Sequence, residues 1–494
     1  MLCAAGYLFE LERRGYLQAS AFAPGVVLKH PAAVAQLRRK FLRAGPNALE
    51  AFTYDDHRKN LRRNVASQKT VTIRSQSPLA HADMEWLTRP ANYLTRLNPM
   101  NSQYETIVVG CGGIGSAALY WLSRRLGAKV LAIEQFELGH VRGSSQDHSR
   151  IFRLAQHQPE YADLARSALN VWRDVEGESG VALLLKTGGV VIEQMGSRDV
   201  DQAGVRDLRG YVRAMTEQGI AFDKLTGPEV NQRWPQFQLT DREQAIYQAD
   251  SGLIDAAKSN AVHTVLAQAH GATVLSNTTV REIRPVGNGV EITTDRESFR
   301  AASIVIASGA WTNRLLDGVK IDLPITVTQE QVTYYSTPHL REFAPDRFPV
   351  WIWHGAHSFY GFPVYGEVAT KMGQHNGGPE VTADTRTFEP DPTRQQRYRK
   401  FLERYLPRFL GPELYTKTCL YTVPYDQKFV LSQLPEYPQI SVFIGAGTAF
   451  KFTSLMGKIL SELALDRRTE HEIDSFRFDR PAIQDPTFRK EVHC

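Results

Sequence analysis

The chain has 494 residues, of which 42% are hydrophobic and 22% charged. This ordinary globular composition excludes collagen-like chains and long disorder. No uninterrupted apolar stretch reaches the roughly 18 residues of a membrane span. The four cysteines form no CxxC pair, which argues against a disulfide framework or a zinc ribbon and fits a reducing compartment. We expect a cytoplasmic protein of about two to four domains, with no metal site and no membrane contact.

The net charge of +5 is concentrated at one end of the chain. Residues 1–99 hold 15 Lys and Arg against 7 Asp and Glu, whereas the remainder is slightly acidic. The basic balance therefore gives little support to a nucleic-acid partner. We interpret 1–99 as an N-terminal basic extension of unknown role, and organellar import through it stays open as an alternative to a cytoplasmic location.

A dense pattern of alternating elements begins after this extension. Glu105–Val109 is typical of a buried strand, Gly115–Arg125 has apolar residues at helical spacing, and Lys129–Ile133 is a second strand. This order predicts a βαβ unit of a parallel sheet.

A glycine-rich turn joins the first strand to the first helix. It reads Gly110-Cys111-Gly112-Gly113-Ile114-Gly115. Gly110 permits the tight turn, Gly112 lets the backbone approach a pyrophosphate, and Gly115 allows close packing of helix and strand. Glu134 ends the second strand, where an acid hydrogen-bonds a ribose with a free 2′-hydroxyl. The unit predicts a dinucleotide cofactor, FAD or NAD rather than NADP.

Further elements follow along the chain. Helices are expected at 256–269, 392–405 and 454–465, and strands at 272–275, 280–283, 290–293, 303–307 and 442–444. Residues from about 320 to 375 are expected to be mostly β.

Four separate stretches carry a resemblance to a known family. The first is the glycine-rich turn with Glu134, and the second is Gly143–Arg153, which reads GSSQDHSRIFR. The third is Thr370–His375, and the fourth is Thr418–Tyr421 followed by Ala449–Phe452. On these motifs, residues from about 104 to 475 resemble the D-amino-acid-oxidase-like FAD oxidoreductases. More narrowly, they are similar to the monomeric sarcosine oxidase and N-methyltryptophan oxidase family.

The resemblance implies an α/β (α+β) fold in which a Rossmann-like FAD-binding domain is interwoven with a β-sheet-rich substrate domain. We expect the FAD-binding domain to comprise 100–185, 245–320 and 415–475, the substrate domain 186–244 and 321–414, and a C-terminal tail 476–494.

The implied activity is FAD-dependent oxidation of the C–N bond of a secondary amine or N-methyl amino acid. The imine product hydrolyses, and O2 is reduced to hydrogen peroxide. The partners would be this small substrate and O2, and a monomer is favoured. Open alternatives are a dehydrogenase of the same fold with another acceptor, an oxidase of a cyclic (pipecolate-like) or glycated amino acid, and a flavoprotein without turnover. An NAD-dependent dehydrogenase fits the layout least.

The resemblance also implies site residues. Cys419 would hold the flavin covalently through a thioether, Lys371 would promote oxygen reduction, and Arg150 and Lys451 would hold the substrate carboxylate. The amine would be oriented or desolvated by Tyr360, Tyr421 and His375. Further cofactor contacts are expected from Ser144, Ser145, Arg153, Val280 and Lys451. Departures from the family pattern at Gln146 and Ala449 leave the identity of the substrate open.

Overall fold

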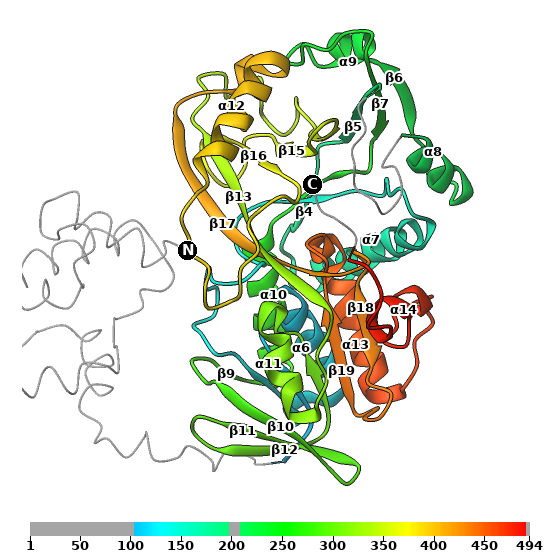
Figure 1. Ribbon diagram of the computed structural model, residues 1–494, viewed down its shortest axis with the longest axis vertical. Helices are drawn as coiled ribbons and strands as arrows, with labels where there is room; N and C mark the ends of the chain where they lie inside the picture. Colours follow the sequence, from blue (N-terminus) through cyan, green and yellow to red (C-terminus); the bar gives the residue numbers. More distant parts are fainter. Residues whose placement is uncertain (1–102, 197–207, 491–494) are drawn as a thin grey trace, which may run out of the picture. The chain divides into compact units, whose positions relative to one another are not determined.

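The computed structural model describes residues 103–196 and 208–490, and the N-terminal extension lies outside them. The described residues form two eight-stranded sheets and one three-stranded sheet (Figure 1). In Figure 1, helices α6, α10, α11 and α13 lie near the first sheet, and α12 lies beside the second. The mixed α/β class predicted from the sequence is confirmed.

The first sheet contains the predicted βαβ unit. Its order is β10-β11-β12-β1-β2-β9, and β19 pairs with both β12 and β18. The β19, β12, β1, β2 and β9 strands run parallel. Its strands are β1 Gln103–Val109, β2 Val130–Ile133, β9 Thr273–Leu275, β10 Val280–Val286, β11 Gly289–Thr294, β12 Ser298–Ile306, β18 Val430–Gln433 and β19 Ile440–Ile444.

Both faces of this sheet are buried, as parallel strands require. Successive side chains of β1 alternate between two cores: Val108 packs with one, while Ile107 and Val109 pack with the other. The core around Ile107 includes α11, Thr312–Leu316. The core around Val108 is completed by α6 Gly113–Leu126, α7 Pro159–Ser179, α10 Ala256–Ala269 and α13 Thr453–Asp466.

The second sheet has the order β17-β13-β16-β15-β14-β5-β7-β6. Helix α12, Pro392–Tyr405, covers one of its faces with Tyr398, Phe401 and Leu402. The strands are β5 Gly189–Gln194, β6 Asp223–Thr226, β7 Glu243–Gln248, β13 Ile325–Tyr335, β14 Val350–His354, β15 Phe359–Phe362, β16 Thr370–Gln374 and β17 Glu413–Pro424.

Strand β17 belongs to this second sheet, since it pairs with β13 from Pro424 opposite Ile325 to Glu413 opposite Tyr335. The expected domain boundary at 415 groups it instead with the FAD-binding segments. The three-stranded sheet has the order β3-β8-β4, with β3 at Arg150–Phe152, β8 at Gly252–Ile254 and β4 at Leu184–Lys186. The remaining α-helices of the described residues are α8 Leu208–Glu217, α9 Gly227–Arg233 and α14 Pro481–Gln484.

Candidate active site

The glycine-rich turn between β1 and α6 is shaped by two contacts that only glycine allows. Gly110 has a φ of +92°, and a Cβ there would lie 2.7 Å from the carbonyl oxygen of Ala307. A Cβ on Gly115 would lie 1.8 Å from the oxygen of Gly110. Helix α6 has Gly112 at its N-terminal cap and no side-chain cap. The turn therefore presents backbone N–H groups at a positive helix end, which suits a pyrophosphate.

Glu134 follows β2 beside this turn and is 5% exposed. Its carboxylate accepts hydrogen bonds from the backbone N–H of Cys111 at 2.8 Å and of Phe136 at 3.1 Å. Burial raises the pKa of Glu134, but the contacts with His140 and the two N–H groups outweigh this effect and lower the pKa below its ordinary value. Glu134 is thus an anion fixed where a ribose hydroxyl would donate to it.

The segment 143–149 connects the turn with the strand that carries Cys419. Ser145 Oγ accepts from the N–H of Gly113 at 2.8 Å. Ser144 Oγ donates to the carbonyl of Leu420, and Gln146 Nε2 donates to the carbonyl of Thr418 at 2.6 Å. Two side chains of this segment therefore fix the backbone on both sides of Cys419.

The register of the second sheet brings the other predicted residues to one face. Lys371 lies opposite Tyr334, and Cys419 lies opposite Glu330 on the same strand, β13. Because side chains alternate along a strand, Lys371, Cys419 and Tyr421 share a face. The neighbouring residue Met372 points instead into the core beneath α12. Strands β16 and β17, which lie far apart in the sequence, thus place Lys371, Cys419 and Tyr421 on one face of the sheet, which we call the wall.

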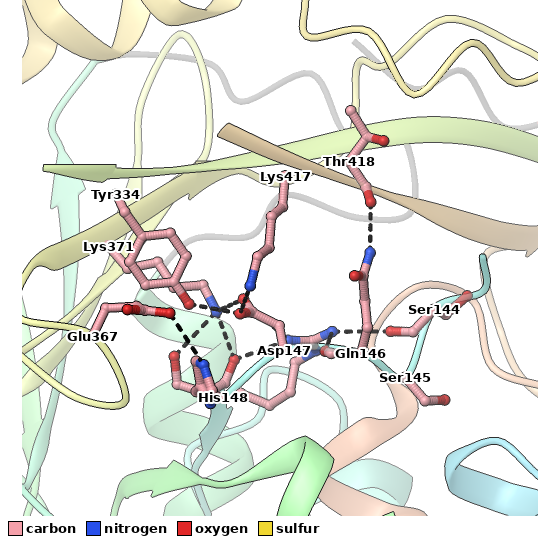
Figure 2. A network of polar contacts seen from close by, with 12 residues as sticks. Ser144, Ser145, Gln146, Asp147, His148, Tyr334, Glu367, Lys371, Lys417 and Thr418 are labelled. Carbon is pink, nitrogen blue, oxygen red and sulfur yellow. Dashed lines mark hydrogen bonds and ion pairs between the residues drawn. The ribbon is translucent and has the colours of Figure 1, made fainter. Parts of the chain in front are cut away.

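Lys371 is held tightly in this wall, with its side chain 2% exposed. Its ammonium donates to the carbonyl of Ser149 at 2.9 Å and to Ser149 Oγ at 3.0 Å. It also pairs with Asp147 at 2.6 Å (Figure 2). Burial lowers the pKa of Lys371 to about 8, and the charge of Asp147 opposes that shift. The lysine is therefore a buried, oriented cation rather than a surface side chain.

Cys419 and the two predicted tyrosines are half-buried. Burial raises the pKa of the Cys419 thiol, and the positive charge of Arg150 works against this shift. Burial also raises the pKa values of Tyr360 and Tyr421 well above the ordinary tyrosine value. The ring of His375 lies 5.9 Å from that of Tyr421. The two tyrosines are neutral near pH 7 and give the wall an apolar body with polar tips.

The predicted carboxylate-binding cations are partly engaged with the backbone. Arg150 donates to the carbonyls of Ser149 at 3.0 Å and Ser144 at 2.9 Å, and its guanidinium lies 5.8 Å from the ring centre of Phe450. Lys451 is 7% exposed and donates to the carbonyl of Thr448.

Arg153 donates to the carbonyl of Ala155, and its guanidinium lies 5.3 Å from the ring centre of Tyr211. Arginine has five N–H donors, so Arg150 and Arg153 both retain donors for an anion.

One cavity of about 830 Å³ unites these groups. Of the residues predicted from the sequence, Gly115 alone does not line it, because it packs behind the turn. The predicted residues that line it are Gly110, Gly112, Gly113, Ile114, Glu134, Ser144, Ser145, Arg150, Arg153, Val280, Tyr360, Lys371, His375, Cys419, Tyr421 and Lys451.

Sequence reasoning missed three polar side chains of the same cluster: Asp147, Tyr334 and Lys417. Tyr334 donates to Asp147 at 2.7 Å, and Lys417 lies 3.3 Å from the same carboxylate oxygen. Asp147 is part of the motif GSSQDHSRIFR, so the sequence does place it in a segment expected to contribute to the site. Its partners lie on β13 and β17, however, and only the folded register brings them together.

Comparison with known proteins decides the family. The family described as DAO, FAD dependent oxidoreductase, matches residues 105–463. The chain is a member of the DAO family. This confirms the resemblance read from the four motifs and makes the protein an FAD-dependent oxidoreductase acting on CH–NH donors.

Several proteins are similar to this chain over most of their length. Monomeric sarcosine oxidase of Bacillus sp. (strain B-0618) is 31% identical over 391 residues, which are 78% of this chain and 98% of the relative. Peroxisomal sarcosine oxidase of Homo sapiens is 30% identical over 76% of this chain and 96% of its own. Among solved structures, the open form of a Tyr258Phe mutant of NikD, an unusual amino acid oxidase essential for nikkomycin biosynthesis, has a TM-score of 0.68 and 26% identity. That match covers 76% of this chain and 97% of the NikD chain.

The residues that line the cavity fit FAD. The turn at Gly110 has a backbone conformation and a close approach to Ala307 that a side chain would disturb, Glu134 is an anion beside this turn, and the cavity that the turn lines continues to Cys419. Within 103–196 and 208–490, no group of three or more His, Cys, Asp or Glu side chains is arranged to hold a metal ion. In the same ranges, no helix combines the length and apolarity needed to cross a membrane.

Proposed function

We propose that the protein oxidises the C–N bond of a secondary amine, most simply an N-methyl amino acid, and passes the electrons to O2 to give hydrogen peroxide. The observation that carries this proposal is the single wall on which Tyr360, Lys371, Cys419 and Tyr421 face one cavity with Arg150 and Lys451. Relatives named as sarcosine oxidases and N-methyl-L-tryptophan oxidases support the substrate class.

Substrate binding is assigned to the two cations and the aromatic wall. Arg150 offers a planar fork suited to a carboxylate, and Lys451 adds a compact second charge. Tyr360, Tyr421 and His375 exclude water from the amine and orient it. Holding the reacting C–H bond in one geometry contributes to the rate because the entropy of alignment is lost on binding rather than in the transition state.

The reaction itself divides between the cofactor and the chain. FAD, when bound, would supply the acceptor for the hydride equivalent of the C–H bond next to the nitrogen. The amine also loses the proton on its nitrogen, so that the C–N single bond becomes the C=N bond of an imine, which water then hydrolyses. Lys371 contributes a fixed cation where negative charge develops on oxygen. Ser144, Ser145, Arg153 and Val280 are assigned to the cofactor.

Covalent attachment of the flavin is assigned to Cys419. A thiolate is the nucleophile that a thioether bond requires, and Arg150, Arg386 and Lys371 favour that charged form of the half-buried thiol. Ser144 and Gln146 hold the backbone at either side of the sulfur, so the thiol has a fixed position.

The predicted domain division, a monomeric state and a cytoplasmic location belong to the same proposal, with 1–99 as an extension outside the catalytic part. Relatives named as monomeric sarcosine oxidases support the monomer. A dehydrogenase with another acceptor is the second candidate, and the buried cation Lys371 disfavours it because oxygen reduction gains most from such a charge.

A substrate screen tests this proposal directly. Purified holoenzyme is mixed separately with sarcosine, pipecolate, proline, N-methyltryptophan and glycated amino acids, while oxygen consumption and peroxide are recorded. Peroxide with an N-methyl or cyclic amino acid is the expected result. Flavin bleaching without oxygen consumption would instead identify a dehydrogenase. No bleaching with any amine under anaerobic conditions would contradict the proposed reaction class.

A further inference from the structure

A buried carboxylate lies beside Lys371 in the segment that precedes β3. Asp147 has a φ of +84°, in the left-handed region that side chains rarely adopt, although Asp and Asn tolerate it best. The residue is 9% exposed. Carboxylates are almost never buried this deeply unless they are paired, so both the backbone conformation and the burial need compensation by the contacts of the carboxylate.

Four groups on four different strands surround this carboxylate. Lys371 on β16 lies 2.6 Å from Oδ2, Lys417 on β17 lies 3.3 Å from Oδ1, and Arg150 on β3 lies 4.0 Å from Oδ2. The hydroxyl of Tyr334 on β13 donates to Oδ1 at 2.7 Å (Figure 2). Burial raises the pKa of Asp147, but Lys371 and Arg150 outweigh it and hold the pKa far below the ordinary value. The carboxylate is therefore an anion.

Apart from Asp147, the charge of Lys371 is supported by the neutral groups of Ser149 and by two aromatic rings. Its ammonium donates to Ser149 and lies 4.7 Å and 5.5 Å from the ring centres of Phe362 and Tyr334. Arg150, a second cation, disfavours the charged lysine, whereas the thiol of Cys419 favours it once ionised. Across the described part of the chain, the ion pairs of Lys371 involve Asp147 alone.

We propose that Asp147 is a positioning residue for Lys371, whose carboxylate keeps the ammonium charged and fixed in the cavity wall. This inference rests on the proposed function, in which Lys371 is the cation that serves oxygen reduction. An opposite charge at close range favours the charged form of a lysine. Removing the carboxylate therefore lowers the pKa of Lys371 further, and the ammonium is lost at a pH where the wild-type protein still holds it.

The test replaces Asp147 by Asn, which has the same shape, tolerates the left-handed backbone and carries no charge. The first readout is the titration of Lys371 in oxidised holoenzyme by NMR of ¹³C-labelled lysine, the signal being assigned by its loss in Lys371→Met. The second is the pH profile of flavin reoxidation by O2. Both midpoints should move to lower pH by about one to three units in Asp147→Asn.

Two further variants make the result specific. Glu367→Gln removes a neighbouring carboxylate that pairs with His148 at 3.3 Å rather than with Lys371, and both midpoints should stay close to the wild-type values. Asp147→Gly removes the carboxylate and suits a positive φ without strain. It should reproduce the shift of Asp147→Asn and replaces that variant if the asparagine protein does not fold.

The outcomes separate this inference from the proposed function. Wild-type midpoints in a folded Asp147 variant would overturn the inference and leave Asp147 as a purely structural residue. If the wild-type reduced flavin does not react with oxygen at all, the proposed oxidase function fails. The NMR midpoint would in that case still decide whether Asp147 sets the charge of Lys371.

Discussion

Glu330 and Arg394 form an ion pair of 2.7 Å in which each side chain is only 2% exposed. Glu330 lies opposite Cys419 on the neighbouring strand. Arg394 also donates to the carbonyl of Gln374, the last residue of the strand β16 that carries Lys371, and to the carbonyl of Asn376, two residues further along the chain. The ion pair therefore links the position opposite Cys419, the predicted flavin attachment, to the end of strand β16. That strand carries Lys371, the lysine predicted to promote oxygen reduction.

Arg394→Met should destabilise the protein strongly, because it leaves the carboxylate of Glu330 buried without its cation. Loss of one partner of a buried pair typically costs about 3–5 kcal/mol. Urea unfolding followed by flavin fluorescence measures the change. Adding Glu330→Gln to Arg394→Met removes the orphaned charge and should restore part of the loss. A double variant as unstable as the single one would show that the pair matters by packing alone.

Gly110→Ala should abolish tight FAD binding. Alanine at a φ of +92° is strained, at a cost of about 1–3 kcal/mol, and its Cβ would also lie 2.7 Å from the backbone oxygen of Ala307. Gly180→Ala is the matched control, since Gly180 has a φ of +66° but no atom lies within 4 Å of the position that its Cβ would take. Flavin content after purification is the measurement. Full flavin occupancy in Gly110→Ala would contradict the pyrophosphate assignment.

Cys419→Ser should release the flavin from the polypeptide. Serine keeps the size of the side chain but lacks the nucleophilic thiolate. After acid denaturation and gel electrophoresis, yellow fluorescence should travel with the wild-type chain and be absent from the variant. Cys111→Ser, which alters the other described thiol, should keep the fluorescent band. Free flavin in the wild-type supernatant would overturn the covalent assignment.

A chain that starts at Met100 should bind FAD and turn over like the full-length protein. The family match begins at residue 105, and every predicted site residue lies after it. Flavin content and peroxide formation of the shortened protein are compared with those of the full chain. Failure of the shortened chain to fold would mean that residues 1–99 belong to the catalytic part.

Local elements were predicted well where the sequence carries its own boundary signals. The expected helices at 256–269 and 392–405 match α10 and α12. Asp255 accepts from the N–H of Lys258, and Asp391 accepts from that of Thr393, so each helix begins at a side-chain cap. The glycines of the β1–α6 turn were recognisable because their spacing reflects contacts within a short unit.

Long-range pairing was less accessible from the sequence. The pairing of β17 with β13 joins residues far apart in the chain, and nothing within Glu413–Pro424 specifies its partner. The same holds for Asp147, since neither its positive φ nor its contacts with Tyr334 and Lys417 can be read from its neighbours. The site residues could nevertheless be predicted, because the motifs that carry them were recognised as parts of one family.

The role of Lys371 in oxygen reduction is the central claim. Lys371→Met keeps a similar volume but removes the charge, and Lys371→Arg retains a cation. Stopped-flow absorbance times the two half-reactions separately. Reoxidation of reduced flavin by O2 should slow by about 10²–10³-fold in Lys371→Met, the scale of losing one pre-organised electrostatic group. Anaerobic reduction by substrate should fall much less, and Lys371→Arg should recover part of the oxygen rate. A Lys371→Met protein that reoxidises at the wild-type rate would contradict this role.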